Sequence, residues 1–336
     1  MLDERKRQVL FAIVRDYIQT AEPVGSRTIA RRYEFGIGAA TIRNEMADLE
    51  EMGFIEQPHT SAGRIPSDRG YRYYVDSLET LPELTVVDAT LIKRHFGGRL
   101  RGHEVVLEAT ARLLSSLTNC VSIVIGPSAA QTRLKVMQVV PLNELSAVLM
   151  LVADNGLVAS EVVRLPEGLS VVDLGEVCRV ITAHYQGRTI DRLHEMNFGA
   201  FAGGIGVRAE TFERAMDKLI SGLERLEGER VVLGGATNIL NQPEFKDLAK
   251  YRDVLKVLEV QELVQKLVAT STTNPYSVSI GAENHLNEMR DCSIITARYT
   301  ISGEGIGHIS ILGPTRIEYP RVLSLLNYIS KLIGQG

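Results

Sequence analysis

The first 75 residues hold the pattern that most restricts the fold: three amphipathic stretches separated by turn residues, then two short extended stretches around a polar loop. Apolar residues recur at helical spacing over residues 4–20, which predicts a first helix. Glu22-Pro23-Val24-Gly25 interrupts this pattern, and Ser26 is a suitable N-cap for a short second helix. A third helix is predicted over about 39–52, because Gly53 has the position of a helix-terminating glycine.

The third predicted helix has two unlike faces. Ile42, Met46 and Leu49 recur at i, i+4 and i+7 and should form its buried stripe. The other face and its flanks carry small residues and hydrogen-bond donors first and carboxylates later: Ala40, Thr41, Arg43, Asn44, Ala47, Asp48 and Glu51. Because phosphate repels carboxylates, only the N-terminal half should approach DNA, as the recognition helix of a helix-turn-helix does.

A strand–loop–strand pattern follows this helix. Residues 54–57 read as a short strand, residues 58–64 as a polar loop, and Ile65-Pro66 as a returning strand. Ser67 can then cap a further helix. Three helices followed by a basic-tipped hairpin predict a winged helix-turn-helix that binds DNA. The alternative interpretation is a generic three-helix bundle with a hairpin.

The charge of the whole chain argues against binding nucleic acid through bulk positive charge, because 37 basic and 41 acidic residues give a net charge of −4. The first 74 residues, however, hold eleven basic and eleven acidic residues, so this segment is neutral. Between Pro23 and Asn44 there are four arginines and one acid, whereas the acids gather at 45–56. We therefore expect a local basic face and weak non-specific affinity for DNA.

The remaining residues change period several times, and a chain of 336 residues has room for two or three domains. Helices are predicted over about 86–96, 103–117, 169–185, 207–226, 244–270 (broken near Arg252–Asp253) and 319–333. Strands are predicted over 121–125, 134–140, 147–153, 157–163, 230–233, 276–280, 294–301 and 307–312. A mixed sheet interrupted by a block of helices predicts an α+β multidomain chain with a mostly helical insertion.

Several long motifs closely resemble the bacterial heat-inducible transcription repressor family HrcA, and the resemblance covers essentially the whole chain. The motifs are Glu22-Pro23-Val24-Gly25-Ser26-Arg27-Thr28-Ile29-Ala30, Ala40-Thr41-Ile42-Arg43-Asn44-Glu45-Met46-Ala47-Asp48-Leu49-Glu50, the segment from Gly53 to Pro66, Gly70-Tyr71-Arg72-Tyr73-Tyr74-Val75-Asp76, Ser293-Ile294-Ile295-Thr296-Ala297 and the segment from Ile311 to Pro320. The family usually has serine before the Ala-Thr of the recognition helix, whereas this chain has Gly38-Ala39. The helix thereby lacks a hydroxyl cap, which should lower the affinity for DNA slightly without abolishing binding.

The resemblance implies a domain layout and a mechanism. It implies a winged-helix domain over 1–80, a GAF-like α/β domain over 81–165 and 256–336, and an inserted, mostly helical dimerising domain over 166–255. It also implies a homodimeric repressor of heat-shock chaperone operons of the groE and dnaK type. Such a repressor binds an inverted-repeat operator, the CIRCE element, is released on heat stress, and is kept active by the chaperonin GroEL.

Reasoning and resemblance together identify the expected DNA contacts. Asn44 suits bidentate adenine recognition, Arg43 suits guanine or phosphate, and the start of the second helix and the wing suit phosphate. The expected residues are Ser26, Arg27, Thr28, Thr41, Arg43, Asn44, His59, Thr60, Ser61 and Arg64.

Other chemistry is not expected. The glycine-rich segments 203–206 and 234–235 lack the βαβ context of a nucleotide site, and the histidines and cysteines lack metal-ligand spacing. No nucleophile elbow or P-loop is present, so we expect no enzyme, no cofactor and no metal. The polar loop Gly281–His285 follows a predicted strand, a position at which ligands bind in many folds, so a small-molecule-sensing regulator is the second hypothesis. An enzyme built on the C-terminal region is the third.

The expected location is the cytoplasm. Residues 1–7 lack the apolar core of a secretory signal, and no apolar run is long enough to span a membrane. Three scattered cysteines, Cys120, Cys178 and Cys292, fit a reducing compartment and no disulfide framework.

Overall fold

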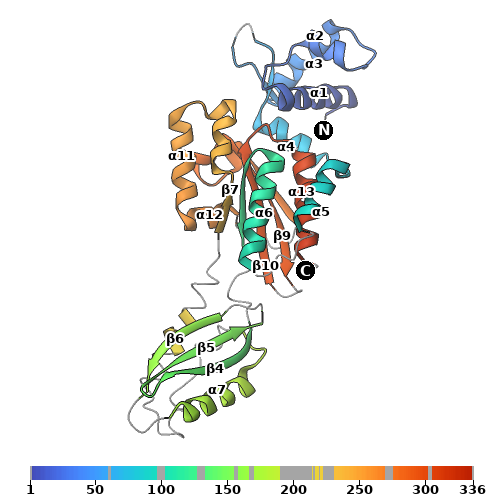
Figure 1. Cartoon of the computed structure of the whole chain (residues 1–336). Coiled ribbons are helices and arrows are strands. Elements are labelled where there is room, and N and C mark those ends of the chain that lie inside the picture. The colour runs from blue at the N-terminus through green and yellow to red at the C-terminus, as the bar shows by residue number, and fades with distance from the viewer. Residues whose placement is uncertain are drawn as a thin grey trace.

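The computed structural model arranges the chain in three parts that follow one another along a line (Figure 1). An N-terminal head of helices and a small hairpin lies at one end, a five-stranded sheet with helices on both faces lies in the middle, and a three-stranded sheet with a helix packed against it lies at the other end. The structure describes residues 2–59, 62–96, 103–126, 133–154, 158–165, 170–189, 214, 216–218, 220–221, 231–268, 275–301 and 305–334.

The head has the element order that the sequence predicts. Its elements are α1 (Glu4–Thr20), α2 (Ser26–Arg32), α3 (Ala39–Glu51), β1 (Ile55–Glu56), β2 (Ile65–Pro66) and α4 (Asp68–Asp76). Asp3 caps α1 by accepting a hydrogen bond from the Lys6 amide, and Ser67 caps α4 by accepting one from the Gly70 amide. One expectation differs: Ser26 is the first helical residue of α2 and is buried, and Gly25 is its N-cap without a side-chain bond.

The middle part is an antiparallel sheet in the order β7-β3-β10-β9-β8. Its strands are β3 (Val121–Ile125), β7 (Val231–Gly234), β8 (Tyr276–Ile280), β9 (Cys292–Ile301) and β10 (Gly305–Pro314). The 3-10 turns η2 (Ala236–Asn241), η3 (Pro243–Phe245), η4 (Gly281–Glu283) and η5 (Asn287–Met289) lie in its connections.

Helices cover both faces of this sheet. On one face, α5 (Val86–Phe96), α6 (His103–Thr118) and α13 (Tyr319–Gly334) pack on Ile295, Ile309 and Ile311. On the other face, α11 (Leu248–Glu259) and α12 (Gln261–Val268) pack on Ile123 and Leu312. Since successive side chains of a strand point to opposite faces, apolar residues on both sides make these strands nearly continuous hydrophobic runs.

The third part is an antiparallel meander of β4 (Leu134–Asn143), β5 (Ser146–Ala153) and β6 (Val158–Arg164) against α7 (Val171–Tyr185). Ser170 and Asp173 form a capping box at the start of α7. Buried residues alternate along β5, and its inward side chains Leu149 and Leu151 meet Leu174 and Ile181 of α7.

The observed division of the chain differs from the predicted one. We expected the meander to belong with residues 81–165 and the insertion to be mostly helical over 166–255. Instead, the meander forms its own sheet with α7, whereas residues 231–259 pack on the five-stranded sheet. Periodicity identifies a strand but not the sheet that it joins, because strand pairing depends on contacts distant in sequence.

Two smaller expectations concern helices. The predicted break near Arg252–Asp253 is wrong, because α11 continues to Glu259 and the chain breaks at Val260. Most of the helix expected over 207–226 lies outside the described residues, apart from short helical pieces between Arg214 and Ser221. In the part of the chain that the structure describes, no helix is long and apolar enough to cross a bilayer.

Candidate nucleic-acid interface

Helix α3 presents the two faces that its sequence predicts. Ile42, Met46 and Leu49 are buried, and Arg43 and Asn44 are exposed beside half-buried Thr41. Gly38 is the N-cap of the helix; it provides no side-chain cap bond, and nothing lies within 4 Å of where its Cβ atom would be. The first half of α3 therefore offers an exposed guanidinium and an exposed amide on a face that no other part of the described head covers.

The carboxylates of α3 are paired with basic residues at the start of α1. Lys6 Nζ lies 3.0 Å from Glu45 Oε2 and 3.1 Å from Asp48 Oδ2, and Arg5 lies 3.5 Å from Glu45. These carboxylates, Glu45 first, raise the pKa of the Lys6 ammonium above its ordinary value. The negative charge that we expected to repel phosphate is thus partly neutralised within the head, a pairing that the sequence analysis did not identify.

Helix α2 places two predicted contacts at the surface. Arg27 and Thr28 are exposed in its first turn, whereas the Ser26 side chain is buried. At the other end of the helix, Arg32 Nη1 lies 2.6 Å from Oδ1 of buried Asp16 and so joins α2 to α1. At Ser26, the backbone is therefore more accessible to a ligand than the buried hydroxyl group.

The base of the wing is joined to the segment before α2. Val24 and Arg64 exchange two backbone hydrogen bonds, of 2.8 and 2.9 Å. Gly63 packs so tightly there that a Cβ atom would lie 2.5 Å from the carbonyl carbon and oxygen of Val24. The Arg64 guanidinium binds Glu50 Oε2 through Nε at 2.9 Å and Nη2 at 2.8 Å. His59 is exposed, and Thr60 and Ser61 lie outside the described residues.

Each of the three predicted groups contributes residues to one hollow of about 320 Å³, although Thr28, Thr41, Asn44 and His59 are not among those that line it. Its lining comes from the start of α2, from α3 and from the wing: Val24, Gly25, Ser26, Arg27, Arg43, Met46, Ala62, Gly63 and Arg64. Three arginines from three different elements thus surround one concave surface of the head. Such a surface suits a negatively charged backbone, because arginine donates several hydrogen bonds to phosphate oxygens.

The described residues offer little for other chemistry. They contain no group of three His, Cys, Asp or Glu residues that could hold a metal ion. Cys120 and Cys178 are buried, and burial raises the pKa of each thiol to about 12. In the loop that we considered for ligands, Asn284 is buried and its amide nitrogen donates to three backbone carbonyls.

Comparisons with known proteins identify one family. The family model for the HrcA protein C terminal domain matches residues 104–323. Proteins named heat-inducible transcription repressor HrcA are similar over nearly the full chain. The one from Pelotomaculum thermopropionicum is 42% identical over 335 residues, which is 99% of this chain and 96% of the relative. The one from Moorella thermoacetica is 42% identical over 99% of this chain and 97% of the relative.

A solved structure is also similar. A crystal structure at 2.2 Å, described as that of a hypothetical protein, is 26% identical and has a TM-score of 0.66. The similarity covers 100% of this chain and 98% of that chain.

Proposed function

The chain belongs to the HrcA family of heat-inducible transcription repressors, and from this we propose that it is a transcriptional repressor whose N-terminal head is a winged helix-turn-helix that binds operator DNA. The observation that carries the proposal is the hollow where exposed Arg27 and Arg43 lie beside Arg64 and the wing. Its three arginines come from the three elements that contact DNA in a winged helix.

We propose that the N-terminal half of α3 enters the major groove. Asn44 would read an adenine through its amide, and Arg43 would bind a guanine or a phosphate. Thr41 would contact the backbone beside them. In support, Arg43 and Asn44 are exposed on the face opposite the buried stripe, and the exposed Ala40 and Ala47 allow close approach.

The flanking elements would hold the phosphates. Arg27 and Thr28, with the backbone at Ser26, would bind phosphates of the DNA strand next to α2. Phosphates next to the wing would be bound by its residues His59, Thr60, Ser61 and Arg64. An arginine has five N–H donors. The two bonds that Arg64 makes to Glu50 therefore still leave it donors for a phosphate.

The assembled form that we propose is a homodimer. Two heads related by a two-fold axis would read the two halves of an inverted repeat, the CIRCE element upstream of groE- and dnaK-type operons. The middle part would be a GAF-like domain, and the part built from the meander and α7 would be the dimerising domain. GroEL would keep the repressor active, so that unfolded clients occupying GroEL during heat stress would release the operator.

One titration tests the DNA-binding proposal. Fluorescence anisotropy would compare an inverted-repeat duplex, a single half-site and a scrambled duplex, with and without GroEL. Asn44→Ala should weaken inverted-repeat binding by about 1–3 kcal/mol and leave scrambled-duplex binding almost unchanged. Asn327→Ala, an exposed asparagine on α13, is the matched control. An equal loss on the operator and the scramble would contradict the role of Asn44, and equal affinity of the unaltered chain for both would contradict the proposed function.

A further inference from the structure

Helix α4 connects the head to the middle part (Figure 1). It follows β2 directly, and its residues contact the end of β8 and the loop after it. The angle between the head and the five-stranded sheet therefore depends in part on how α4 is held against that loop, residues 280–284, beside a bond from Arg316 Nη1 to the Ile18 carbonyl of α1.

Two side chains one helical turn apart on α4 bind this loop. Arg72 donates from Nε to Glu283 Oε1 at 2.8 Å, pairs through Nη2 with Glu283 Oε2, and donates to the Val278 carbonyl at 2.5 Å. Asp68 Oδ2 accepts a hydrogen bond from the Ala282 amide at 2.8 Å. Residues at i and i+4 lie on one face of a helix, so Asp68 and Arg72 hold the loop together.

The loop itself has a fixed shape. Gly281 has φ +54°, and a Cβ atom there would lie 2.1–2.2 Å from the Asp68 carboxylate. Glu283 also accepts a hydrogen bond from the Ile280 amide at 2.9 Å. The amide nitrogen of Asn284 donates to the carbonyls of Gly281, Met289 and Cys292. Asp68 and Arg72 thus bind a rigid part of the middle domain, and only glycine leaves room at their centre.

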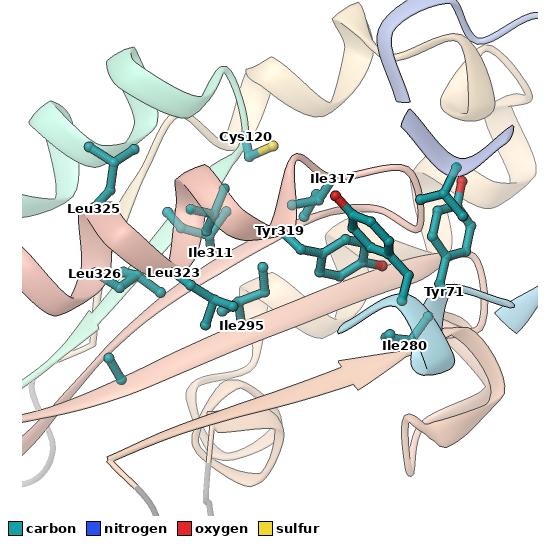
Figure 2. Close-up of a cluster of buried hydrophobic side chains, with 14 of the residues drawn as sticks. Tyr71, Cys120, Ile280, Ile295, Ile311, Ile317, Tyr319, Leu323, Leu325 and Leu326 are labelled. Carbon is teal, nitrogen blue, oxygen red and sulfur yellow. The ribbon is translucent and has the colours of Figure 1, made fainter. Parts of the chain in front are cut away.

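Apolar packing continues across the same junction. Tyr71, between the two binding residues, is 1% exposed, and its ring lies 5.8 Å from that of Tyr319, which is fully buried (Figure 2). Tyr319 is held in turn by a 2.7 Å hydrogen bond with Ser293 and by donation to the Thr315 carbonyl. One face of α4 is therefore joined to the sheet both by polar bonds at its edge and by aromatic packing at its centre.

We propose that Asp68, Arg72 and Glu283 form a clamp that sets the orientation of the head, and thereby the half-site spacing that the dimer recognises. Asp68, Arg72 and Glu283 are therefore positioning residues, because none of them lines the hollow that we propose faces DNA. The consequence for spacing rests on the proposed function. Each base pair inserted between half-sites rotates one of them by about 35°, so a dimer with rigidly held heads tolerates few insertions.

The first test is a spacing series. Operator duplexes with zero to five inserted base pairs would be titrated with the full chain, with Glu283→Gln and with Glu288→Gln. Glu288 is an exposed carboxylate on the next turn of the same loop and serves as the matched control. The affinity of the unaltered chain and of the control should fall tenfold or more when one or two base pairs are inserted. The affinity of Glu283→Gln should fall threefold or less on the same duplexes. A loss by the same factor at every spacing would mean that Glu283 acts only on stability and would overturn the proposed effect on spacing.

The second test measures head orientation without DNA. Spin labels on Gln19→Cys in α1 and Asn327→Cys in α13, both exposed, would report the distance from head to sheet. The natural cysteines are buried, so the label attaches to the introduced ones. An excess of unlabelled chain would restrict the signal to distances within one chain.

Glu283→Gln should broaden the distance distribution, and Glu288→Gln should leave it as it is. An unchanged distribution in Glu283→Gln overturns the clamp, whatever the titrations give. If the unaltered chain fails to prefer the inverted repeat, the proposed function fails, while the spin-label result still decides the clamp.

Discussion

Replacing Gly63 by alanine should detach the wing from the segment before α2. The new Cβ atom would lie 2.5 Å from the carbonyl carbon and oxygen of Val24 and 2.8 Å from the carbonyl carbon of Pro23. These are backbone atoms, so no side-chain rotation relieves the overlap. Carbon atoms in ordinary contact lie about 3.5 Å apart, so residue 63 and the Val24 backbone would have to separate by about 1 Å. That separation would break the bonds between Val24 and Arg64.

The size of the effect follows from those two bonds. The Val24 amide donates to the Arg64 carbonyl at 2.8 Å, and the Arg64 amide donates to the Val24 carbonyl at 2.9 Å. Each such bond contributes about 0.5–1.5 kcal/mol, so Gly63→Ala should raise the free energy of the closed wing by about 1–3 kcal/mol. If the wing must be closed to grip phosphate, operator affinity should fall by a factor of roughly 5 to 150.

Two measurements would check this prediction. Amide hydrogen exchange at Val24 and Arg64 should become faster, because the loss is a local opening of the wing rather than global unfolding. Anisotropy titration on the inverted repeat should show the loss of affinity. Gly175→Ala in α7 is the matched control, since a Cβ atom there would meet only Val139 Cγ1 at 3.5 Å, an ordinary contact far from the head. If Gly63→Ala matched Gly175→Ala in both measurements, the backbone would have yielded without cost and the reasoning would be refuted.

Three further predictions concern two ion pairs. Arg64→Ala should lower the salt slope of operator binding by about one, as for a single phosphate contact, and Glu50→Gln should strengthen binding by freeing Arg64; an unchanged slope in titrations from low to moderate salt would reject the contact. Arg321 lowers the pKa of Asp88 from its ordinary 3.8. The resulting stability is present above about pH 4 and lost as the pH falls through the lowered pKa. Urea unfolding should therefore show Asp88→Asn destabilised near neutral pH, with a difference that shrinks in acid; a pH-independent difference would contradict this.

Local features of the fold could be predicted from the sequence. The bounds predicted for α1, β3 and β8 agree with the structure, because apolar spacing and turn residues determine such elements within a few residues. The exposure of Arg43 and Asn44 follows from the same helical period, which turns them away from the buried stripe. The part of the candidate site that lies on one helix was thus accessible from sequence.

Contacts between distant segments could not be predicted. Arg64 and Glu50 are 14 positions apart, and Arg72 and Glu283 are 211 positions apart. No spacing rule connects such residues, since their meeting depends on how whole elements pack. The loop at Gly281–His285 shows the same limit: the sequence identified a polar loop at a strand end, but its contact with α4 required the structure.

For DNA binding, the positions of the charged residues matter more than the net charge of the chain. Its net charge is −4, which argues against bulk electrostatic attraction as the main source of the proposed DNA affinity. Within the head, Lys6 pairs with Glu45 and Asp48 of α3, while Arg43 and Asn44 of the same helix stay exposed. Because α1 partly neutralises Glu45 and Asp48, the first half of α3 meets less repulsion of phosphate from these two carboxylates. If the head binds operator DNA as proposed, it should gain little from non-specific contact, and its selectivity should come from a few side chains and from the angle at which α4 holds them.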